Sequence, residues 1–406
     1  MKAVVFRGVG DIRMEEVAEP KIKDATDAVI RITSSAICGT DLHLIRGTMP
    51  GMKPGTVIGH EAVGVVEQIG KDVRNLKEGD RVIVPSTIAC GYCSYCRAGY
   101  FAQCDNSNPL GKRAGTAFFG GPVMCGAFDG LQAEKARIPF ANVGLVKIPD
   151  DVHDEDAILL SDIFPTGYFG AELAEIREGD TVAVFGCGPV GQFSILSAFL
   201  MGAGRVLAID RIEERLEMAK KAGAEIINFE KDDPVETILH LTGGIGVDRI
   251  IDAVGVDAEQ PDHGPAKRKS KLLRDQFDDE LDKVAPRKSP KGANWQPGTA
   301  PSQVLHWAVQ SIAKAGTLSV IGVYPQTFMF FPLGDAMMKN LTIKAGNCNH
   351  RKYIPHLIEL VQSGTVTPSK VITQMAPLTD AIEAYKAFDL RKHGWIKVEL
   401  VPAEIA

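Results

Sequence analysis

Residues 181–191 read TVAVFGCGPVG, an apolar strand followed by a G-x-G-x-x-G motif. The strand, Val182–Phe185, passes through the motif into a helical pattern that runs from Gly191 to Met201. Glycines in this motif permit a tight turn and close backbone approach, so that a dinucleotide pyrophosphate can bind at the N-terminus of the helix. The residues expected to bind that cofactor are Gly186, Gly188, Pro189, Val190 and Gly191.

The sequence around this motif continues the alternation of strand and helix. From about Asp156, apolar strands alternate with longer helical patterns, which indicates a parallel sheet covered by helices. The other clear segments are strands at Val206–Ile209, Arg249–Ala253 and Leu318–Gly322, and helices at Glu213–Ala222 and near residues 302–315. We therefore predict a dinucleotide-binding domain in this half of the chain.

Asp210 ends the strand that follows the motif, nineteen residues beyond Gly191. A carboxylate at this place would hydrogen-bond both hydroxyls of the adenosine ribose and would repel a 2′-phosphate, which favours NAD over NADP. Arg211 follows directly and leaves the alternative open, because an arginine there can accommodate that phosphate. We expect NAD as the cofactor, with Asp210 and Arg211 at its adenosine end.

Residues 257–302 interrupt the rhythm with a charged stretch that contains Pro and Gly, and we interpret them as an insertion. Apolar residues recur at helical spacing from Leu272 to Val284, so one amphipathic helix is expected between loop-like flanks. A solvated surface excursion and an oligomer contact are both open interpretations of so charged a segment.

The first 150 residues have a different pattern. Short apolar and β-branched segments alternate with turns rich in Gly, Pro and Asp. The clearest of them are Val4–Phe6, Ala28–Ile32, Ala62–Ile69 and Arg81–Val84. This pattern predicts a sheet-rich or barrel-like domain.

Four of the eight cysteines lie within fifteen residues, at Cys90, Cys93, Cys96 and Cys104. The chain shows no export signal, so metal binding outranks disulfide formation for this C-x2-C-x2-C-x7-C spacing. Four thiolates on one short loop can close a tetrahedron around zinc and leave no open position, which makes a structural site. An iron–sulfur cluster is the competing interpretation.

Two separated segments carry a second candidate metal site. Cys38 lies in CGTDLH, residues 38–43, and His60 lies in GHE, residues 59–61. From Gly59 the sequence follows the pattern G-H-E-x2-G-x5-G-x2-V, which resembles the zinc signature of the zinc-dependent medium-chain alcohol dehydrogenases. The cysteine loop also falls where that family has its structural zinc.

The resemblance implies that Cys38 and His60 bind a catalytic zinc ion, with a third ligand from the start of the second domain. Residues 160–168, LSDIFPTGY, are similar to the aspartate-containing version of the glutathione-independent formaldehyde dehydrogenase branch, so Asp162 is the expected third ligand. Three protein ligands leave the fourth position for water or substrate. A helix N-cap is the alternative role for Asp162, and Glu61 is placed to enter or orient the coordination shell.

The same resemblance, together with the chemistry of hydride transfer, assigns a path for the proton. Zinc lowers the pKa of a bound alcohol or aldehyde hydrate, and the released proton has to reach water. Thr40 lies two residues after Cys38 and His43 three further on, so a hydroxyl can relay the proton through the cofactor ribose to an imidazole. In the alternative interpretation Thr40 caps the following turn and His43 is a solvated side chain.

Composition excludes other classes of protein. The chain has 51 acidic against 45 basic residues and a net charge of -6, too even a balance for a nucleic-acid groove or an anionic membrane partner. Residues 1–10 lack the apolar core of a signal peptide, and no apolar run approaches the roughly 20 residues that a bilayer span needs. We therefore expect a cytoplasmic protein that acts on a small molecule, without nucleic-acid or membrane partners.

The resemblance covers nearly the whole chain except the insertion, and it implies a complete α/β architecture. A β-rich catalytic domain similar to the GroES-like fold is expected from residues 1–160 and 331–406, with a Rossmann coenzyme domain, a doubly wound parallel sheet, at 161–330. Two zinc ions per chain and a homo-oligomer, dimer or tetramer, are also implied. The expected reaction is hydride transfer between an alcohol or aldehyde hydrate, formaldehyde among them, and NAD.

Two rival functions stay open. In the formaldehyde branch a long loop covers the adenine end of the cofactor, so residues 257–302 could form a lid that retains NAD, and the enzyme would then dismutate aldehydes. A structural or regulatory protein could keep the fold without chemistry, although the intact ligand set argues against it. The candidates for the substrate pocket wall are Phe118, Phe119, Phe164 and Trp307.

Overall fold

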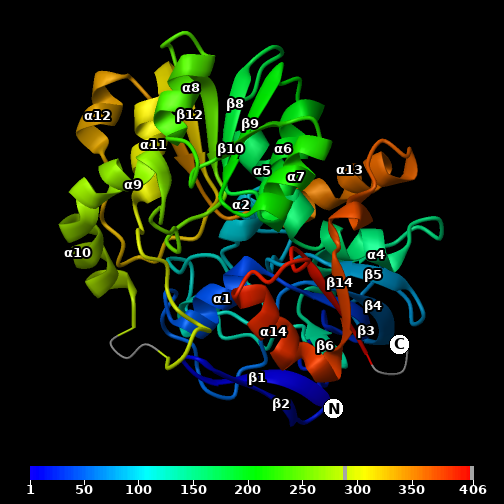
Figure 1. Ribbon diagram of the computed structural model, residues 1–406. Helices are drawn as coiled ribbons and strands as arrows, with labels where there is room; N and C mark the ends of the chain where they lie inside the picture. The colour runs from blue at the N-terminus through cyan, green and yellow to red at the C-terminus, as the bar shows by residue number, and fades with distance from the viewer. Residues whose placement is uncertain (287–289, 403–406) are drawn as a thin grey trace. The chain divides into compact units, whose positions relative to one another are not determined.

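The computed structural model describes residues 1–286 and 290–402, which form two compact units (Figure 1). Unit 1 comprises Met1–Pro165, Pro290–Trp295 and Asn347–Ala406, and unit 2 comprises Thr166–Ser289 and Gln296–Gly346. The α/β class and the two-domain organisation expected from the sequence are confirmed.

Unit 2 is built on a six-stranded parallel sheet with the strand order β10-β9-β8-β11-β12-β13. Its strands are β8 (Thr181–Phe185), β9 (Arg205–Asp210), β10 (Glu225–Asn228), β11 (Val247–Asp252), β12 (Ile312–Val320) and β13 (Thr342–Ala345). Counted from β8, this is the 3-2-1-4-5-6 order of doubly wound dinucleotide-binding sheets, which confirms the Rossmann-type domain.

Helices cover both faces of this sheet because its strands are apolar on both sides. The main helices of unit 2 are α5 (Ile163–Leu173), α6 (Pro189–Leu200), α7 (Glu213–Lys221), α8 (Pro234–Leu241), α11 (Gln303–Ser311) and α12 (Leu333–Met338). Ala183 and Phe185 of β8 pack in one core with α8 and α11, whereas Val182 and Val184 pack in another with α5, α6 and α7. Figure 1 shows the two groups of helices on opposite sides of the sheet.

The insertion is largely helical within the part that the structure describes. It contains α9 (Gly264–Ser270) and α10 (Arg274–Val284). Phe277 is fully buried on α10, so the expected amphipathic helix is confirmed. Leu272, which the pattern places on the apolar side, lies before α10 and is exposed.

Two sequence expectations about neighbouring segments are wrong. The flank before α10 is the helix α9 and not a loop, because Lys269 on α9 forms ion pairs with acidic residues on and next to α8. The helix expected near residues 302–315 ends at Ser311, and β12 begins at Ile312. Pairing of Ile312 with Val247 of β11 draws this segment into the sheet and overrides its helical spacing.

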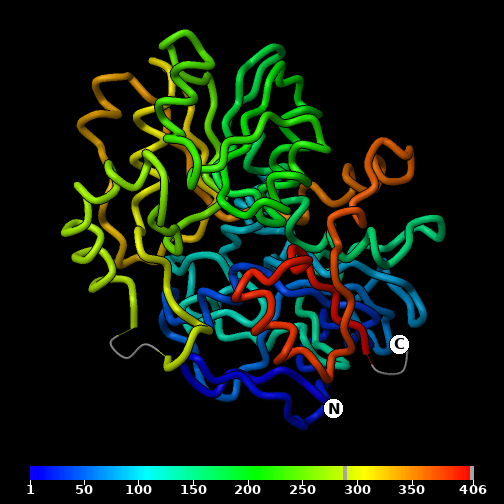
Figure 2. Tube along the Cα trace, in the orientation of Figure 1, coloured from blue at the N-terminus to red at the C-terminus, as the bar shows by residue number. Residues whose placement is uncertain are grey.

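Unit 1 is rich in β-structure, as the sequence predicts. Its main sheet has the strand order β14-β15-β3-β4-β5-β7, with β6 paired to β3, and β1 and β2 form a separate hairpin at the N-terminus (Figure 2). The strands are β1 (Lys2–Gly8), β2 (Asp11–Glu16), β3 (Ala28–Ile37), β4 (Ala62–Ile69), β5 (Arg81–Val84), β6 (Lys135–Ile138), β7 (Val146–Lys147), β14 (Gln374–Pro377) and β15 (Val398–Val401). The helices are α1 (Gly39–Arg46), α2 (Ser94–Arg97), α3 (Ala141–Gly144), α4 (Asp154–Ala157), α13 (His350–Gln362) and α14 (Ala381–Asp389).

Alternate residues of the unit 1 strands form a shared core. Ile30 and Ile32 of β3 pack with Val82 and Val84 of β5 in one cluster, as the two-residue period of a pleated strand requires. Phe119 belongs to the same cluster and is 2% exposed. This pocket-wall candidate is therefore a core residue.

The two units differ at three places from the domain limits expected from the sequence. Residues 161–165 group with unit 1. Residues 331–346 group with unit 2, because β13 pairs with β12 there. Residues 290–295, inside the insertion, group with unit 1.

Trp295 accounts for the last of these differences. Its side chain is 6% exposed and packs in a unit 1 core cluster. Asp389 Oδ2 accepts hydrogen bonds from the Trp295 backbone N–H at 2.7 Å and from the Asn294 side chain at 3.0 Å. Arg46 pairs with the other Asp389 oxygen at 2.8 Å. These contacts place residues 290–295 in unit 1.

Close packing of β3 against β4 leads to a test. A Cβ at Gly64 of β4 would lie 2.3 Å from the carbonyl oxygen of Arg31 in β3. Gly64→Ala should therefore destabilise the protein by about 1–3 kcal/mol, the usual cost of overpacking. Gly8→Ala is the matched control, because nothing lies within 4 Å of an added Cβ there. Thermal unfolding should give a lower midpoint for Gly64→Ala alone; equal midpoints would contradict this account.

Candidate functional site

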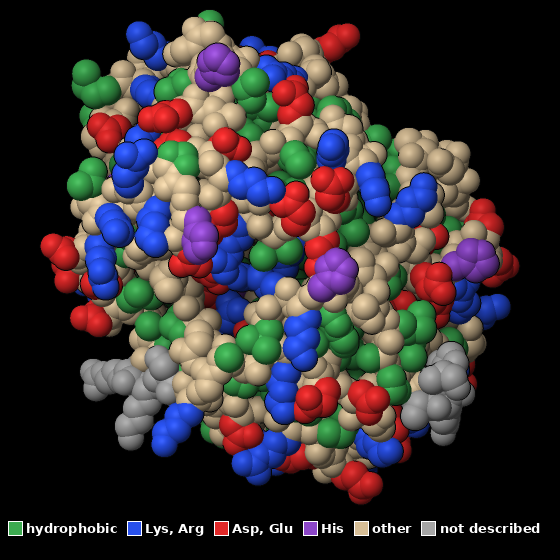
Figure 3. Space-filling model, viewed as in Figure 1, with side chains coloured by type: hydrophobic (Ala, Val, Ile, Leu, Met, Phe, Trp, Pro, Cys, Tyr) green, Lys and Arg blue, Asp and Glu red, His purple; other side chains and the backbone are tan. Residues whose placement is uncertain are grey.

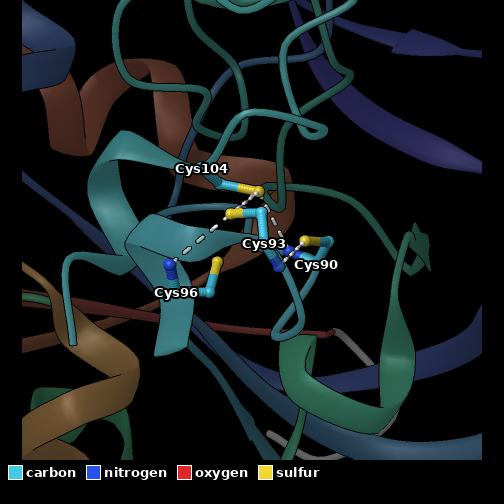
Figure 4. Close-up of side chains that lie close together, drawn as sticks. All are labelled: Cys90, Cys93, Cys96 and Cys104. Atoms are coloured by element: carbon cyan, nitrogen blue, oxygen red, sulfur yellow. Dashed lines mark hydrogen bonds between the residues drawn. The ribbon is translucent and has the colours of Figure 1, made fainter. Parts of the chain in front are cut away.

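The cysteine loop brings four thiols together. The sulfur atoms of Cys90, Cys93, Cys96 and Cys104 all lie within 4.8 Å of one another, and Figure 4 shows these side chains gathered at one point of the loop. Cys93 and Cys104 have their sulfur atoms 4.0 Å apart. Two thiolates on one tetrahedral zinc, with bonds of about 2.3 Å, lie about 3.8 Å apart. The loop therefore fits a closed zinc site.

Backbone N–H groups are directed at these sulfur atoms. The Cys90 N–H donates to Cys104 Sγ at 3.2 Å, and the Cys93 N–H donates to Cys90 Sγ at 3.4 Å. Burial raises the pKa of Cys93, but N–H donors from Cys96 and Asp105 help to outweigh it and bring the pKa down to about 7. Such donors favour the thiolate, which is the metal-binding form of cysteine.

The second group is assembled by the pairing of β3 with β4. These antiparallel strands have Ser35 opposite Ala62, so the residues after β3 and before β4 lie at the same end of the pair. Cys38 follows β3 directly, and His60 and Glu61 precede β4. The pairing therefore brings together residues that are far apart in the sequence.

Asp162 completes a set of three donors. Its Oδ2 lies 3.4 Å from Cys38 Sγ and 3.3 Å from His60 Nε2. Two ligands bound at about 2.1 Å to one tetrahedral zinc lie about 3.4 Å apart, so these separations fit a shared ion. All three side chains are buried. Sulfur, imidazole nitrogen and carboxylate oxygen are donors that zinc accepts.

Neighbouring side chains orient these donors. Asp41 on α1 places Oδ1 3.1 Å from His60 Nδ1, and its Oδ2 accepts from the Cys38 backbone N–H at 3.1 Å. His350 Nε2 lies 2.7 Å from Asp162 Oδ1, so the two oxygens of this carboxylate face different partners. Outer partners of this kind fix the tautomer and orientation of metal ligands.

Glu61 forms a fully buried ion pair. Lys397 Nζ lies 2.7 and 2.6 Å from the two Glu61 carboxylate oxygens, and it also donates to the Ile37 carbonyl at 3.0 Å. Both charged side chains are 0% exposed. A Glu61 oxygen lies within 4.8 Å of the donor atoms of Cys38, His60 and Asp162. Glu61 is therefore close enough to approach the coordination shell, while Lys397 balances its charge.

The electrostatics of the group favour a cation. Burial, and next the Asp162 charge, raises the pKa of the Cys38 thiol to about 11. Burial also raises the pKa of Asp162, but hydrogen bonds from His350 and His60 outweigh it and hold that pKa well below its usual range. A divalent cation among these donors would stabilise the thiolate and release its proton.

The sequence does not single out Asp41, His350 or Lys397. Lys397 leaves one trace, a charged residue inside the mostly apolar segment WIKVELV, residues 395–401. His350 ends the polar run NCNH, residues 347–350. Neither trace identifies a partner, because Asp162 and Glu61 lie 188 and 336 residues away along the chain.

The residues expected to move the proton lie on α1. His43 is buried, and Thr40, one helical turn before it, is half-buried. Residues three apart on a helix are neighbours on one face. His43 Nδ1 lies 3.1 Å from Thr48 Oγ1, so the alternative of a solvated His43 is wrong.

The remaining pocket-wall candidates separate into different environments. The ring of Phe118 lies edge-on to His60, with centroids 6.1 Å apart, beside the donor group. Phe164 is fully buried. Trp307 packs against Phe185 and Phe229 in the core of unit 2, so its assignment to a substrate pocket is wrong.

The G-x-G-x-x-G motif joins β8 to α6, as expected. Gly188 is the N-cap of α6, and Pro189 and Val190 open the helix. A Cβ at Gly191 would lie 1.8 Å from the Gly186 carbonyl oxygen, so only glycine lets the helix pack here. The unpaired N–H groups of the first helical turn are where a pyrophosphate binds.

Asp210 is fixed next to this motif by backbone groups. Its Oδ2 accepts from the Cys187 N–H at 2.8 Å, and its Oδ1 accepts from the N–H groups of Arg211 and Ile212 at 2.6 and 2.9 Å. A carboxylate has about four acceptor positions, so after these three N–H groups about one position stays open to a ribose hydroxyl. The Arg211 guanidinium, in contrast, is held by carboxylates.

Two family models match the chain. Residues 24–150 match the alcohol dehydrogenase GroES-like domain, and residues 189–261 match the zinc-binding dehydrogenase model. The first match lies in unit 1 and the second in unit 2.

Similarity extends over whole proteins. The chain is 39% identical to the uncharacterized zinc-type alcohol dehydrogenase-like protein AdhB of Bacillus subtilis, over 99% of this chain and 100% of that protein. It is 33% identical to the glutathione-independent formaldehyde dehydrogenase of Pseudomonas aeruginosa, over 96% and 94% of the two chains. Among solved structures, the alcohol dehydrogenase TADH from Thermus sp. ATN1 has 34% identity and a TM-score of 0.79, with 99% and 100% covered.

The two donor groups predict two zinc ions per chain, with different roles. Cys93→Ser should lose one ion and lower the thermal midpoint, because a closed site contributes folding energy. Asp162→Ala should also lose one ion, but from the other group, while the chain stays folded. Elemental analysis with thermal unfolding checks both variants. One zinc in the unaltered protein, or stoichiometric iron, would refute the assignment.

Proposed function

The chain belongs to the zinc-dependent medium-chain alcohol dehydrogenases, and from this premise we propose that it oxidises a small alcohol or aldehyde hydrate with NAD. The three donors Cys38, His60 and Asp162 carry the proposal, because Asp162 Oδ2 lies 3.4 Å from Cys38 Sγ and 3.3 Å from His60 Nε2, separations that suit one tetrahedral ion. Three protein ligands leave the fourth position for the substrate oxygen.

The roles of the two cofactors follow from general chemistry. A zinc ion held by these three residues would lower the pKa of a substrate oxygen, and NAD would supply the hydride acceptor. In unit 2 the first turn of α6 binds the pyrophosphate, and Asp210 accepts from the adenosine ribose. These assignments rest on the motif and on the backbone hydrogen bonds that fix the Asp210 carboxylate.

Side chains of α1 transfer the substrate proton. Thr40 accepts it at its hydroxyl, and His43 passes it on towards solvent. His43 Nδ1 lies 3.1 Å from Thr48 Oγ1, and this contact holds the imidazole in place. Glu61 stays paired with Lys397 next to the ligands and tunes the charge that they present.

Asp162 favours an aldehyde hydrate as the substrate. The segment LSDIFPTGY, residues 160–168, resembles the aspartate-containing version of the formaldehyde dehydrogenase branch, and the chain is 33% identical to one protein of that name. Dismutation of aldehydes is the second candidate. It is favoured by the folded insertion, because an element that pairs with Arg211 at the adenosine end of the expected cofactor site would slow cofactor release.

Two observations bear on partners other than small molecules. On the face that Figure 3 shows, acidic and basic side chains are intermingled. In the described parts of the chain, residues 1–286 and 290–402, no helix is both long and apolar enough to cross a membrane. The cytoplasmic location and the dimeric or tetrameric state stay predictions.

A substrate panel tests the proposed reaction. Purified protein should produce NADH from short alcohols or from formaldehyde when NAD is added, because hydride has no other acceptor. The same panel without added NAD is the comparison. Turnover of aldehyde to equal amounts of acid and alcohol in that arm would replace dehydrogenation by dismutation. No turnover in either arm, with two zinc ions bound, would indicate a non-catalytic protein.

Asp162→Asn tests the third ligand. The substitution removes the charge but nearly preserves the shape, and asparagine caps helices about as well as aspartate. A zinc ligand should not tolerate it, so activity should fall by about 100-fold or more and zinc content should move from two towards one. Asp150→Asn, at an exposed turn, is the matched control. Near-normal activity and metal content in the Asp162 variant would make Asp162 a helix cap.

A further inference from the structure

Arg211 occupies the position that decides between NAD and NADP. It follows Asp210 at the carboxyl end of β9, and cofactors bind outside the carboxyl ends of such sheets. A guanidinium there has the charge and geometry to bind a 2′-phosphate. Whether Arg211 attracts such a phosphate depends on the groups with which its guanidinium already forms ion pairs.

Three carboxylates surround the Arg211 guanidinium. Glu259 forms the shortest ion pair, Asp262 Oδ2 lies at 3.4 Å and Glu230 Oε1 at 3.7 Å. Glu259 and Asp262 belong to the insertion, whereas Glu230 follows β10, which pairs with β9.

Docking of the insertion keeps these carboxylates in place. Glu230 accepts from the Asp262 backbone N–H at 2.9 Å and from the His263 N–H at 2.8 Å. Further along, Lys269 on α9 pairs with Asp233 at 3.0 Å and with another acidic residue of α8. The acidic residues next to Arg211 are therefore part of a folded element.

This arrangement distinguishes a ribose hydroxyl from a phosphate. A 2′-phosphate would bring further negative charge to an acidic group and would have to displace carboxylates from Arg211. Arg211 and Glu259 are each only 24% exposed, so solvent ions screen this pair less than an exposed one. A neutral 2′-hydroxyl meets neither obstacle.

We propose that the insertion is a cofactor-selecting element, in which Glu259 and Asp262 neutralise Arg211 and reserve the adenosine end of the site for NAD over NADP. The inference rests on the proposed function, since it requires NAD at the G-x-G-x-x-G motif. It gives the insertion a role that a solvated excursion would not have.

Binding measurements on the full chain test the proposal. Dissociation constants for NAD and for NADP are measured by titration calorimetry in the unaltered protein and in the double variant Glu259→Gln, Asp262→Asn. We expect NADP to bind about tenfold more tightly in the variant, because Arg211 is released and like charge is removed. NAD should change by no more than about twofold, because its hydroxyl is uncharged. Asp262→Asn alone, at a side chain 71% exposed, should give a smaller gain without risk to the fold.

Adding Arg211→Gln to the double variant separates two explanations. The carboxylates either neutralise Arg211 or simply repel the 2′-phosphate. Most of the tenfold gain should disappear, since the released cation is gone. Glu217→Gln, exposed on α7, controls for the loss of one negative charge and should leave both constants unchanged.

The other possible outcomes contradict different parts of the proposal. A lower thermal midpoint with an unchanged NAD to NADP ratio would make the acidic group a docking contact alone. A gain that persists without Arg211 would refute neutralisation. NAD binding with an unmoved ratio sinks this inference and spares the proposed function, whereas failure of the unaltered protein to bind either nucleotide sinks both.

Discussion

The register between β3 and β4 is the constraint on which the candidate centre depends. Ser35 pairs with Ala62, and this places the end of β3 beside the start of β4, so Cys38 meets His60. A slip of one residue would turn every side chain of a strand to the opposite face. Gly64 belongs to the same constraint, because only glycine lets the Arg31 carbonyl approach so closely. Part of the motif that resembles a zinc signature, its Gly64, is therefore required by the packing of β4 against β3.

Buried charge is the second constraint on this centre. Glu61 and Lys397 are both fully buried, and desolvation of such ions costs several kcal/mol each even after relaxation. Their mutual contacts and the Ile37 carbonyl offset that cost, whereas loss of either partner would leave about 3–5 kcal/mol uncompensated. Asp162 divides its oxygens between His350 and the other two donors. A cation between those donors would relieve the negative charge that remains, so metal binding and stability are coupled.

The parts of the fold that the sequence predicts are those with a local signal. The strand before Gly186, the helix after it and the cysteine loop are each indicated by one short stretch of sequence. The structure has all three at the expected places. The helix expected to run to residue 315 fails because pairing of Ile312 with β11 overrides local spacing. Trp307 fails for a related reason, since an aromatic residue fits a core and a pocket wall equally well until its neighbours are known. Lys397 could not be found from the sequence, because its role exists only where β15 meets β3 and the Glu61 side chain.

A sequence motif identifies a residue type, but it does not show which groups of the fold already bind that side chain. Asp210 and Arg211 are adjacent in the sequence, and a motif argument treats them as competitors for the same ribose. The fold separates their roles: backbone N–H groups fix the Asp210 carboxylate beside the glycine motif, while carboxylates of the insertion and of the β10 turn hold the Arg211 guanidinium. Hydrogen bonds from neutral N–H groups leave the Asp210 charge in place, whereas ion pairs cancel that of Arg211. The ion pairs of Arg211 come partly from a segment about fifty residues further along the chain, which no local motif includes.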